Sequence, residues 1–224
     1  MEQSDDAATR HILDAIDGIV PEEARGRERT KARLMRAAYE VFAEVGLDGA
    51  SVEAICERAG FTRGAFYSNF STKDELFLEL VRAVTDRKLE AVSDRVDGLR
   101  ARDATLTPSE LVQNVLEGTV EGLLDVVLMN EIRLRAMRDD ETARAYLAWL
   151  SSLIDRVQQM IEALADSYGL RLRLPARDFA RLVLIVWEDA LVSAAIERLD
   201  YVGLRTRAEK RTQQLAIALV DTSS

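Results

Sequence analysis

The sequence predicts an all-α fold, with three helices in an N-terminal domain and longer helices after it. Of the 224 residues, 48% are hydrophobic, which is enough to build a core. Only 3 Pro and 11 Gly interrupt the chain, so turn-forming residues are scarce and long helices are favoured. No alternation of apolar and polar residues between hairpin turns indicates a strand.

The first helices are predicted from apolar spacing and from capping residues. Apolar residues at helical spacing predict a helix from Arg27 to Val45. Ser51 is a good N-cap for a second helix, and Gly60 can supply the left-handed conformation that ends it. Thr62 can cap a third helix. Two short helices joined by a tight turn that contains glycine form a helix-turn-helix unit, whose second helix enters the major groove of DNA.

The third helix is expected to bury Phe66 and Phe70, which lie four residues apart, and to present its opposite side to DNA. Arginine reads guanine through paired hydrogen bonds, so Arg63 is the candidate for base readout, with a phosphate contact as the alternative. The hydroxyl of Tyr67 suits a phosphate oxygen, and the alternative is a packing role. The candidate DNA contacts are Arg27, Arg29, Lys31, Ser51, Thr62, Arg63, Gly64, Ala65, Tyr67, Ser68, Asn69 and Lys73.

A fourth helix is predicted from about Thr72 to Val96, with a capping box within residues 71–75. Lys73 lies in the first turn of this helix, where its charge opposes the helix dipole. A phosphate held jointly by the ammonium group and the helix end would explain this placement. We therefore expect Lys73 to contact the DNA backbone.

Charge is distributed unevenly along the chain. The formal net charge of the whole is −9, but the segment from Arg25 to Lys73 carries +3 and the remainder −12. Within Arg25–Arg36, six basic residues accompany a single acid. Positive charge is thus concentrated where phosphates would lie, and the acidic remainder is expected to face away from DNA.

These features together resemble the DNA-binding domain of the tetracycline-repressor (TetR) family of transcription regulators, over about Thr30 to Leu80. The matching elements are Gly46, Ala59-Gly60, Thr62, Tyr67, Phe70 and Lys73-Asp74-Glu75-Leu76. The resemblance implies a homodimer that binds double-stranded DNA at a palindromic operator, as a repressor released by an unidentified small-molecule effector. Alternatives are an activator or ligand-independent regulator and, in a different class, a helical interaction protein without DNA binding.

Other classes of function find no support in the residues. His11 is the only histidine, and the sequence has no cysteine pair, phosphate-binding glycine loop or nucleophile motif. No catalytic residue, metal site or cofactor is therefore predicted, and Cys56 is expected to be an inert core thiol. The longest purely apolar run near the C-terminus, Leu182 to Trp187, is too short to span a membrane, so we expect a soluble cytoplasmic protein.

The predicted domains are an acidic extension at 1–24, a DNA-binding domain at 25–73 and a helical ligand-binding and dimerisation domain at 74–224. The extension carries seven acids and is a frayed tail, a docked helix or a segment that competes with DNA. A linker is expected at Gly98 to Pro108, with Thr107 and Glu110 capping the next helix. Further helices are predicted at about 108–128, 130–138, 141–168, 175–200 and 206–221, with breaks at Asp139-Asp140, Gly169 to Pro175 and Gly203.

Two sets of candidates lie in the helical domain. Polar or aromatic residues within apolar stretches are candidates for an effector site, with ordinary packing as the alternative. They are Asn114, Asn130, Arg133, Trp149, Trp187 and Glu188, and the last of these could instead bond across a subunit interface. Apolar residues that cover more than one face of the last two helices predict a two-fold interface, or else packing within one subunit. The interface candidates are Val183, Trp187, Ala190, Ala194, Leu215 and Leu219.

Overall fold

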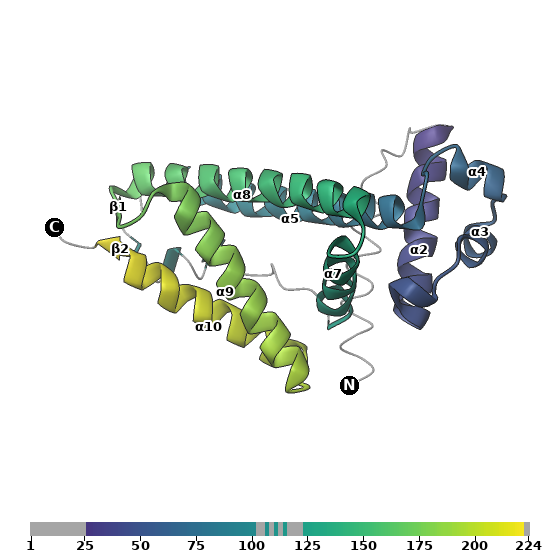
Figure 1. Ribbon diagram of the computed structural model, residues 1–224. Coiled ribbons are helices and arrows are strands. Elements are labelled where there is room, and N and C mark those ends of the chain that lie inside the picture. Colours follow the sequence, from purple (N-terminus) through teal and green to yellow (C-terminus); the bar gives the residue numbers. More distant parts are fainter. Residues whose placement is uncertain (1–25, 102–105, 108–109, 112–113, 116–122, 222–224) are drawn as a thin grey trace. The chain divides into compact units, whose positions relative to one another are not determined.

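A computed structural model describes residues 26–101, 106–107, 110–111, 114–115 and 123–221. In this part of the chain the all-α prediction is confirmed, with eight helices and two strands of two residues each (Figure 1). The chain forms two compact units. Among the described residues, the N-terminal unit holds 26–87 and 124–149, and the C-terminal unit holds those within 88–123 and 150–221. The predicted extension at 1–24 and residues 116–122 of the predicted helix 108–128 lie outside the described residues.

The N-terminal unit begins with a helix that is longer than the sequence predicted. Helix α2 spans Arg27–Gly49, but Gly46 inside it has φ 73° and ψ 172°, so the regular helix ends at the predicted glycine and one further turn follows. Helices α3 (Val52–Ala59) and α4 (Arg63–Tyr67) come next, and α3 packs against α2 (Figure 1). Helix α5 covers Lys73–Ala101 and contributes residues to both units.

Aromatic side chains form the core of the N-terminal unit. Phe42 of α2, Phe66 and Phe70 at α4, and Phe77 of α5 are all fully buried. The rings of Phe42 and Phe77 meet edge to face at 5.6 Å between centroids, and those of Phe66 and Phe70 lie 5.8 Å apart. The prediction that Phe66 and Phe70 are core residues is therefore confirmed. Because α4 contributes one aromatic side to this core, its opposite side is left to the solvent.

Helix α7 and the first part of helix α8, up to Trp149, complete the N-terminal unit. Helix α7 covers Leu123–Ala136 and is continuous, so the predicted break between 128 and 130 is wrong. Helix α8 covers Asp140–Tyr168, and the predicted break at Asp139-Asp140 is confirmed. The Asp139 carboxylate accepts a hydrogen bond from the Thr142 backbone N–H at 2.7 Å, which caps the start of α8.

In the C-terminal unit, α9 (Ala176–Ile196) and α10 (Tyr201–Leu219) pack side by side (Figure 1). The turn between them holds Arg198 at φ 58°, and the Asp200 side chain accepts from the Gly203 N–H at 2.9 Å. The predicted break at Gly203 is therefore wrong, because a cap three residues earlier starts the helix and Gly203 lies in its first turn. An antiparallel pair joins β1 (Arg171–Leu172) to β2 (Val220–Asp221). The pair is too short to produce a sequence period, so it was not predicted.

The first residues of the predicted linker lie inside a helix. Helix α5 continues through Gly98 to Ala101, so the expected helix end near Val96 is wrong, since one glycine does not end a helix that is otherwise supported. Thr107 and Glu110 form the predicted capping box. The Thr107 N–H donates to the Glu110 carboxylate at 2.8 Å, and the Glu110 N–H donates to Thr107 Oγ1 at 3.3 Å.

Candidate nucleic-acid interface

The turn between α3 and α4 is fixed by local caps and by one arginine. Ser51 Oγ accepts from the Ala54 N–H at 3.1 Å, and Gly60 ends α3 in the left-handed conformation at φ 70°. Arg33 of α2 donates from Nη2 to the carbonyl of Ala59 at 2.9 Å and lies 4.7 Å from the centre of the Phe61 ring. The last turn of α3 is thereby attached to α2, which fixes where α4 begins.

Helix α4 is capped as predicted, and two of its candidate DNA contacts are bonded to the helix itself. Thr62 Oγ1 accepts from the Ala65 N–H at 3.3 Å. The Ser68 hydroxyl donates to the Gly64 carbonyl at 2.8 Å, and the Asn69 amide donates to the Ala65 carbonyl at 2.8 Å. Contacts of Ser68 and Asn69 with DNA stay predictions, and such contacts would have to compete with these bonds.

Arg63 and Tyr67 stand on the exposed face of α4. The Tyr67 side chain is 51% exposed. Arg63 Nη1 lies 2.8 Å from Glu53 Oε1 of α3, and its guanidinium is 5.8 Å from the centre of the Tyr67 ring. Hydrogen bonding with Tyr67 and the charge of Glu53 raise the pKa of Arg63 above its ordinary value. Arg63 is thus charged at any working pH and is held between two neighbours.

Gly64 and Ala65 complete this face of α4. A Cβ added at Gly64 would meet only Thr62 Oγ1, at the ordinary contact distance of 3.7 Å. Packing within the protein therefore does not require a glycine at an exposed helical position where it costs stability. Ala65 is half-buried.

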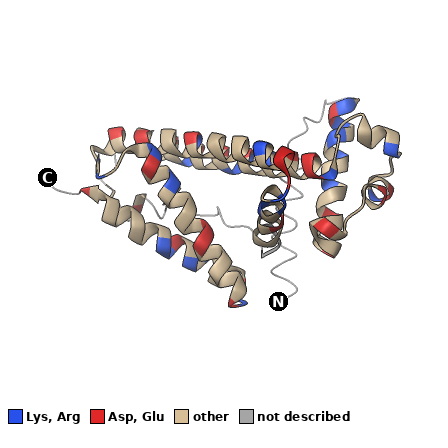
Figure 2. Ribbon diagram, viewed as in Figure 1, with Lys and Arg blue, Asp and Glu red and all other residues tan. Residues whose placement is uncertain are grey.

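The basic residues of α2 form a second group of candidates (Figure 2). Arg27 and Arg29 are exposed in the first turn of the helix. Lys31 differs from them, because its ammonium pairs with Glu79 of α5 at 2.7 Å and lies 5.6 Å from the centre of the Phe70 ring. A phosphate contact by Lys31 would have to displace Glu79, so Arg27 and Arg29 are the stronger candidates.

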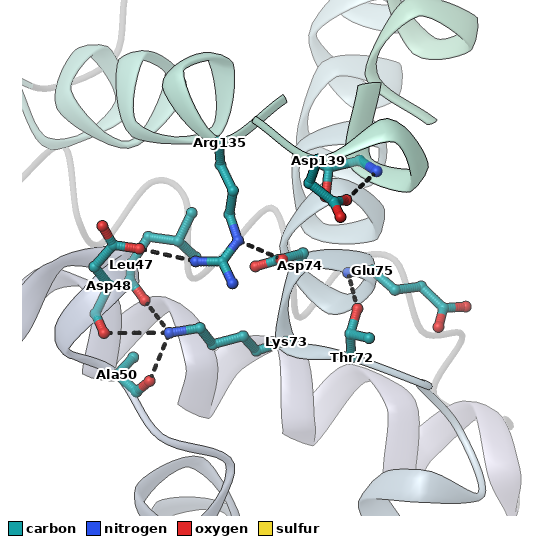
Figure 3. Close-up of polar contacts among 10 residues, drawn as sticks. Leu47, Asp48, Ala50, Thr72, Lys73, Asp74, Glu75, Arg135 and Asp139 are labelled. Carbon is teal, nitrogen blue, oxygen red and sulfur yellow. Dashed lines mark hydrogen bonds and ion pairs between the residues drawn. The ribbon is translucent and has the colours of Figure 1, made fainter. Parts of the chain in front are cut away.

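Lys73 has a set of partners that the sequence analysis did not foresee. Its ammonium donates to the backbone carbonyls of Leu47 at 2.7 Å, Ala50 at 2.9 Å and Asp48 at 3.3 Å (Figure 3). An ammonium has three donors, and all three have acceptors here. The charge at the start of α5 therefore does not need a phosphate to explain it, because the ammonium binds the carbonyls where α2 ends.

The same segment after Gly46 is bonded to α7. The Glu131 carboxylate accepts from the Leu47 N–H at 2.6 Å. Arg135 Nε lies 2.5 Å from Asp74 of α5, and its Nη1 lies 2.8 Å from Asp48 (Figure 3). Sequence reasoning missed both residues. Their spacing of four on α7 was visible, but their partners lie 61 to 87 positions away in the chain.

The candidate effector residues do not gather in one unit. Asn130, Arg133 and Trp149 belong to the N-terminal unit, whereas Trp187 and Glu188 belong to the C-terminal unit. Arg133 donates from Nε to the Tyr146 hydroxyl at 3.0 Å, and the Tyr146 and Trp149 rings lie 5.5 Å apart. The side-chain amides of Asn114 and Asn130 donate to carbonyls one turn earlier in their own helices. An effector site at any of these residues stays a prediction.

Several interface candidates pack against other residues of the same chain. Ala190 and Ala194 are each 0% exposed and pack against Leu204 and Ala208 of α10, so these small residues allow close approach between two helices of one chain. Trp187 packs on the same cluster, while Val183 and Leu219 pack on a second cluster around Phe179, and Leu215 is half-buried. The large apolar side chains left exposed on α9 and α10 are Ile185, Ile196, Val202 and Ile217.

Three further observations concern the described residues. Cys56 is buried, and burial raises the pKa of its thiol, which disfavours the reactive thiolate. No helix among the described residues is long and apolar enough to cross a membrane. The described part of the chain also holds no group of three or more His, Cys, Asp or Glu placed to bind a metal ion.

The capped pair α3 and α4, with a buried aromatic side and an exposed arginine side, defines a helix-turn-helix protein of the all-α class. Residues 34–80 match the family model described as "Bacterial regulatory proteins, tetR family". Over these residues the chain is similar to the DNA-binding domain of TetR-family regulators.

Individual relatives show how far the likeness extends. The HTH-type transcriptional regulator UidR of Escherichia coli is 27% identical over 114 residues, which are 51% of this chain and 55% of UidR. This chain thus spans about half the length of the curated relative. The structure of GusR from Salmonella enterica matches with a TM-score of 0.65 at 21% identity, covering 88% of this chain and 100% of GusR.

A further structural relative is FadR of Bacillus subtilis, a transcriptional regulator solved in complex with stearoyl-CoA. It matches with a TM-score of 0.57 at 16% identity, over 80% of this chain and 96% of FadR. At these identities the structural matches establish the fold. UidR and FadR are both described as transcriptional regulators, in agreement with the expectation that this chain is not an enzyme.

Proposed function

We propose that the chain is a DNA-binding transcription regulator that acts as a homodimer on a palindromic operator in the cytoplasm. The exposed face of α4 carries this proposal. Arg63, Gly64 and Tyr67 are presented to solvent over a buried aromatic side, and Gly64 has no packing reason to be glycine. An exposed arginine beside a glycine suits close approach to a DNA groove.

Dimerisation supplies the second reading helix. A recognition helix of five residues, Arg63–Tyr67, contacts few base pairs, so two copies are needed for useful specificity. We place the interface on the exposed apolar side chains of α9 and α10 rather than on Ala190 and Ala194. Exposed isoleucines and valines on neighbouring helices are what a subunit contact would cover.

Regulation is proposed to run by population shift. A small molecule that favours one arrangement of the helices lowers operator affinity by the ratio of its own affinities for the two arrangements. The complex of FadR with stearoyl-CoA supports a small-molecule effector. The bonds from Glu131 and Arg135 of α7 to the segment before α3 are suited to transmit such a change to the reading helix.

The test is selection from a random double-stranded DNA library with the full chain. The expected result is an enriched motif with two inverted half-sites, bound with an affinity that falls steeply as salt rises. Sedimentation of the complex should show two chains per motif. Recovery of no motif above the starting library would refute the proposal and leave the helical interaction protein as the better description.

Release of the protein from DNA by an effector needs a further measurement. Metabolites, with acyl-CoA thioesters among them, are screened for a rise in the thermal midpoint of the free protein. A compound that raises the midpoint should also release the selected DNA. A stabilising compound that tightens DNA binding would instead favour an activator or a co-repressed regulator.

A further inference from the structure

The two helices of the reading unit are joined by one ion pair whose acid is not among the candidate DNA contacts. Glu53 lies in the first turn of α3, and Arg63 is the first residue of α4. Glu53 Oε1 is 2.8 Å from Arg63 Nη1, and the two side chains are 58% and 62% exposed. The ion pair therefore stands at the surface from which Arg63 would reach DNA.

A carboxylate in the first turn of α3 is favoured by the helix dipole, but this does not require a contact with Arg63. Neither stability nor electrostatic attraction to DNA explains the ion pair itself. An ion pair between two exposed side chains contributes little to folding and is screened by salt. A carboxylate beside the reading arginine repels the phosphates and removes part of the positive charge on which binding depends. Either this loss of DNA affinity is offset by some benefit of the carboxylate when DNA is bound, or the loss is merely tolerated.

Orientation of Arg63 is such a benefit. A free arginine side chain has many rotamers, and ordering it on binding costs affinity. Here Glu53 holds Nη1 on one side, and the Tyr67 ring lies 5.8 Å from the guanidinium on the other. Bidentate reading of guanine O6 and N7 needs two parallel N–H bonds from one edge of the guanidinium. The Nε and Nη2 edge can make these bonds while Nη1 keeps its contact with Glu53.

We propose that Glu53 is a positioning residue that sets base specificity, by holding Arg63 in the orientation that reads one guanine in each half-site. This inference rests on the proposed DNA-binding function. It assigns Glu53 an indirect role, because the carboxylate acts through Arg63 and touches no base itself.

The proposal gives Glu53 two effects of opposite sign. Removing its charge should tighten binding to DNA of any sequence, because one repulsive charge per subunit is lost. The same change should lower the preference for guanine at the position that Arg63 reads, by about 2- to 10-fold, the cost of ordering one long side chain. A carboxylate that is merely tolerated would produce only the first effect.

The experiment compares three single variants and one double variant of the full chain with the wild type. Glu53→Gln keeps the shape and removes the charge, and Arg63→Ala identifies the motif position that Arg63 reads. Glu57→Gln is the matched control, because Glu57 is an exposed carboxylate one turn further along the same helix. Each variant is bound to the selected motif, to the motif with that position replaced by each other base, and to unrelated DNA. Thermal midpoints show that all variants are folded.

We expect Glu53→Gln and Glu57→Gln to raise the affinity for unrelated DNA by the same factor. Only Glu53→Gln should lower the preference for guanine at the motif position that Arg63 reads. The variant with both Glu53→Gln and Arg63→Ala should be no less selective than Arg63→Ala alone, because the two residues act as one unit. Equal selectivity in Glu53→Gln and Glu57→Gln would overturn the inference while leaving the proposed function intact. A wild-type chain that selects no motif would overturn both.

Discussion

Replacing Lys73 by methionine tests whether this residue is a structural tether or a phosphate contact. Methionine keeps much of the side chain's length and removes the ammonium group. The Lys73 ammonium donates to the carbonyls of Leu47, Asp48 and Ala50, and those bonds to Leu47 and Ala50 are partly buried. The substitution leaves these carbonyls at the end of α2 without their donor, so the N-terminal unit should lose stability.

The size of the loss follows from the two partly buried bonds. A hydrogen bond to a charged group contributes about 1.5–3 kcal/mol, and the half-exposed position allows water to replace part of it. We therefore expect a loss of about 2–3 kcal/mol in the free energy of unfolding. For a chain of this size that corresponds to a fall of about 4–12 °C in the thermal midpoint. The third bond, to the exposed Asp48 carbonyl, is left out because water can take its place.

Circular dichroism during heating and in urea measures this change at a fixed protein concentration. The matched control is Lys210→Met on α10, which removes the same group from an exposed position and should leave the midpoint almost unchanged. The slope of log affinity for DNA against log salt is measured for both variants. If Lys73→Met retains full stability and lowers that slope by about one per contact, Lys73 binds phosphate and the tether argument fails.

The remaining predictions concern readout, assembly and acid. Arg63→Ala should cost about 1–3 kcal/mol per half-site and relax preference at one position of the motif, whereas uniform loss over all sequences would make Arg63 a phosphate contact. Ile185→Glu should give monomers with unchanged helix content in sedimentation and circular dichroism. Ala194→Glu places a charge in the buried contact between α9 and α10, so it should lower stability by about 3 kcal/mol or more; a stable folded monomer from this variant would contradict the packing. Hydrogen bonds from Thr142 lower the pKa of Asp139 below its value in the unfolded chain. The ionised cap therefore stabilises the folded protein above that unfolded pKa, and this stabilisation is lost as the pH falls below about 4. Asp139→Asn should make the urea midpoint less sensitive to pH between 6 and 3.

Local caps could be predicted from the sequence because each is encoded within a few residues. Ser51 bonds to a backbone group three positions on, and Thr62 does the same. Gly60 adopts the left-handed conformation that the end of α3 requires. Thr107 and Glu110 bond to each other across three positions. In each case both partners lie within a few residues of each other, so residue type and spacing are enough to predict the cap without knowledge of the tertiary structure.

Tertiary partners could not be predicted in the same way. The apolar residues of α9 were visible, but the sequence does not say whether Ala190 and Ala194 meet a helix of the same chain or of a second copy. The break predicted at Gly203 was wrong for a similar reason, because Asp200 caps α10 three residues before this glycine. The sequence shows that the charge of Lys73 opposes the helix dipole, and this placement does need an explanation. Its explanation required the position of the α2 end, which is 23 to 26 residues away in the chain.

The contacts of Leu47, Asp48 and Ala50 suggest which bonds are able to move α3 and which only stabilise it. Lys73 binds three carbonyls, and because no residue of α7 takes part in these bonds, shifting α7 leaves them intact. Arg135 of α7 is different, since it holds Asp74 of α5, whose side chain is 14% exposed, together with Asp48, which is 87% exposed. The exposed Asp48 pair is weak and easily exchanged with water, whereas the Asp74 pair is costly to break. A movement of α7 would therefore carry α5 with it and release Asp48. The segment before α3 would keep its Lys73 tether and the bond from the Leu47 N–H to Glu131, and would lose its pair with Arg135.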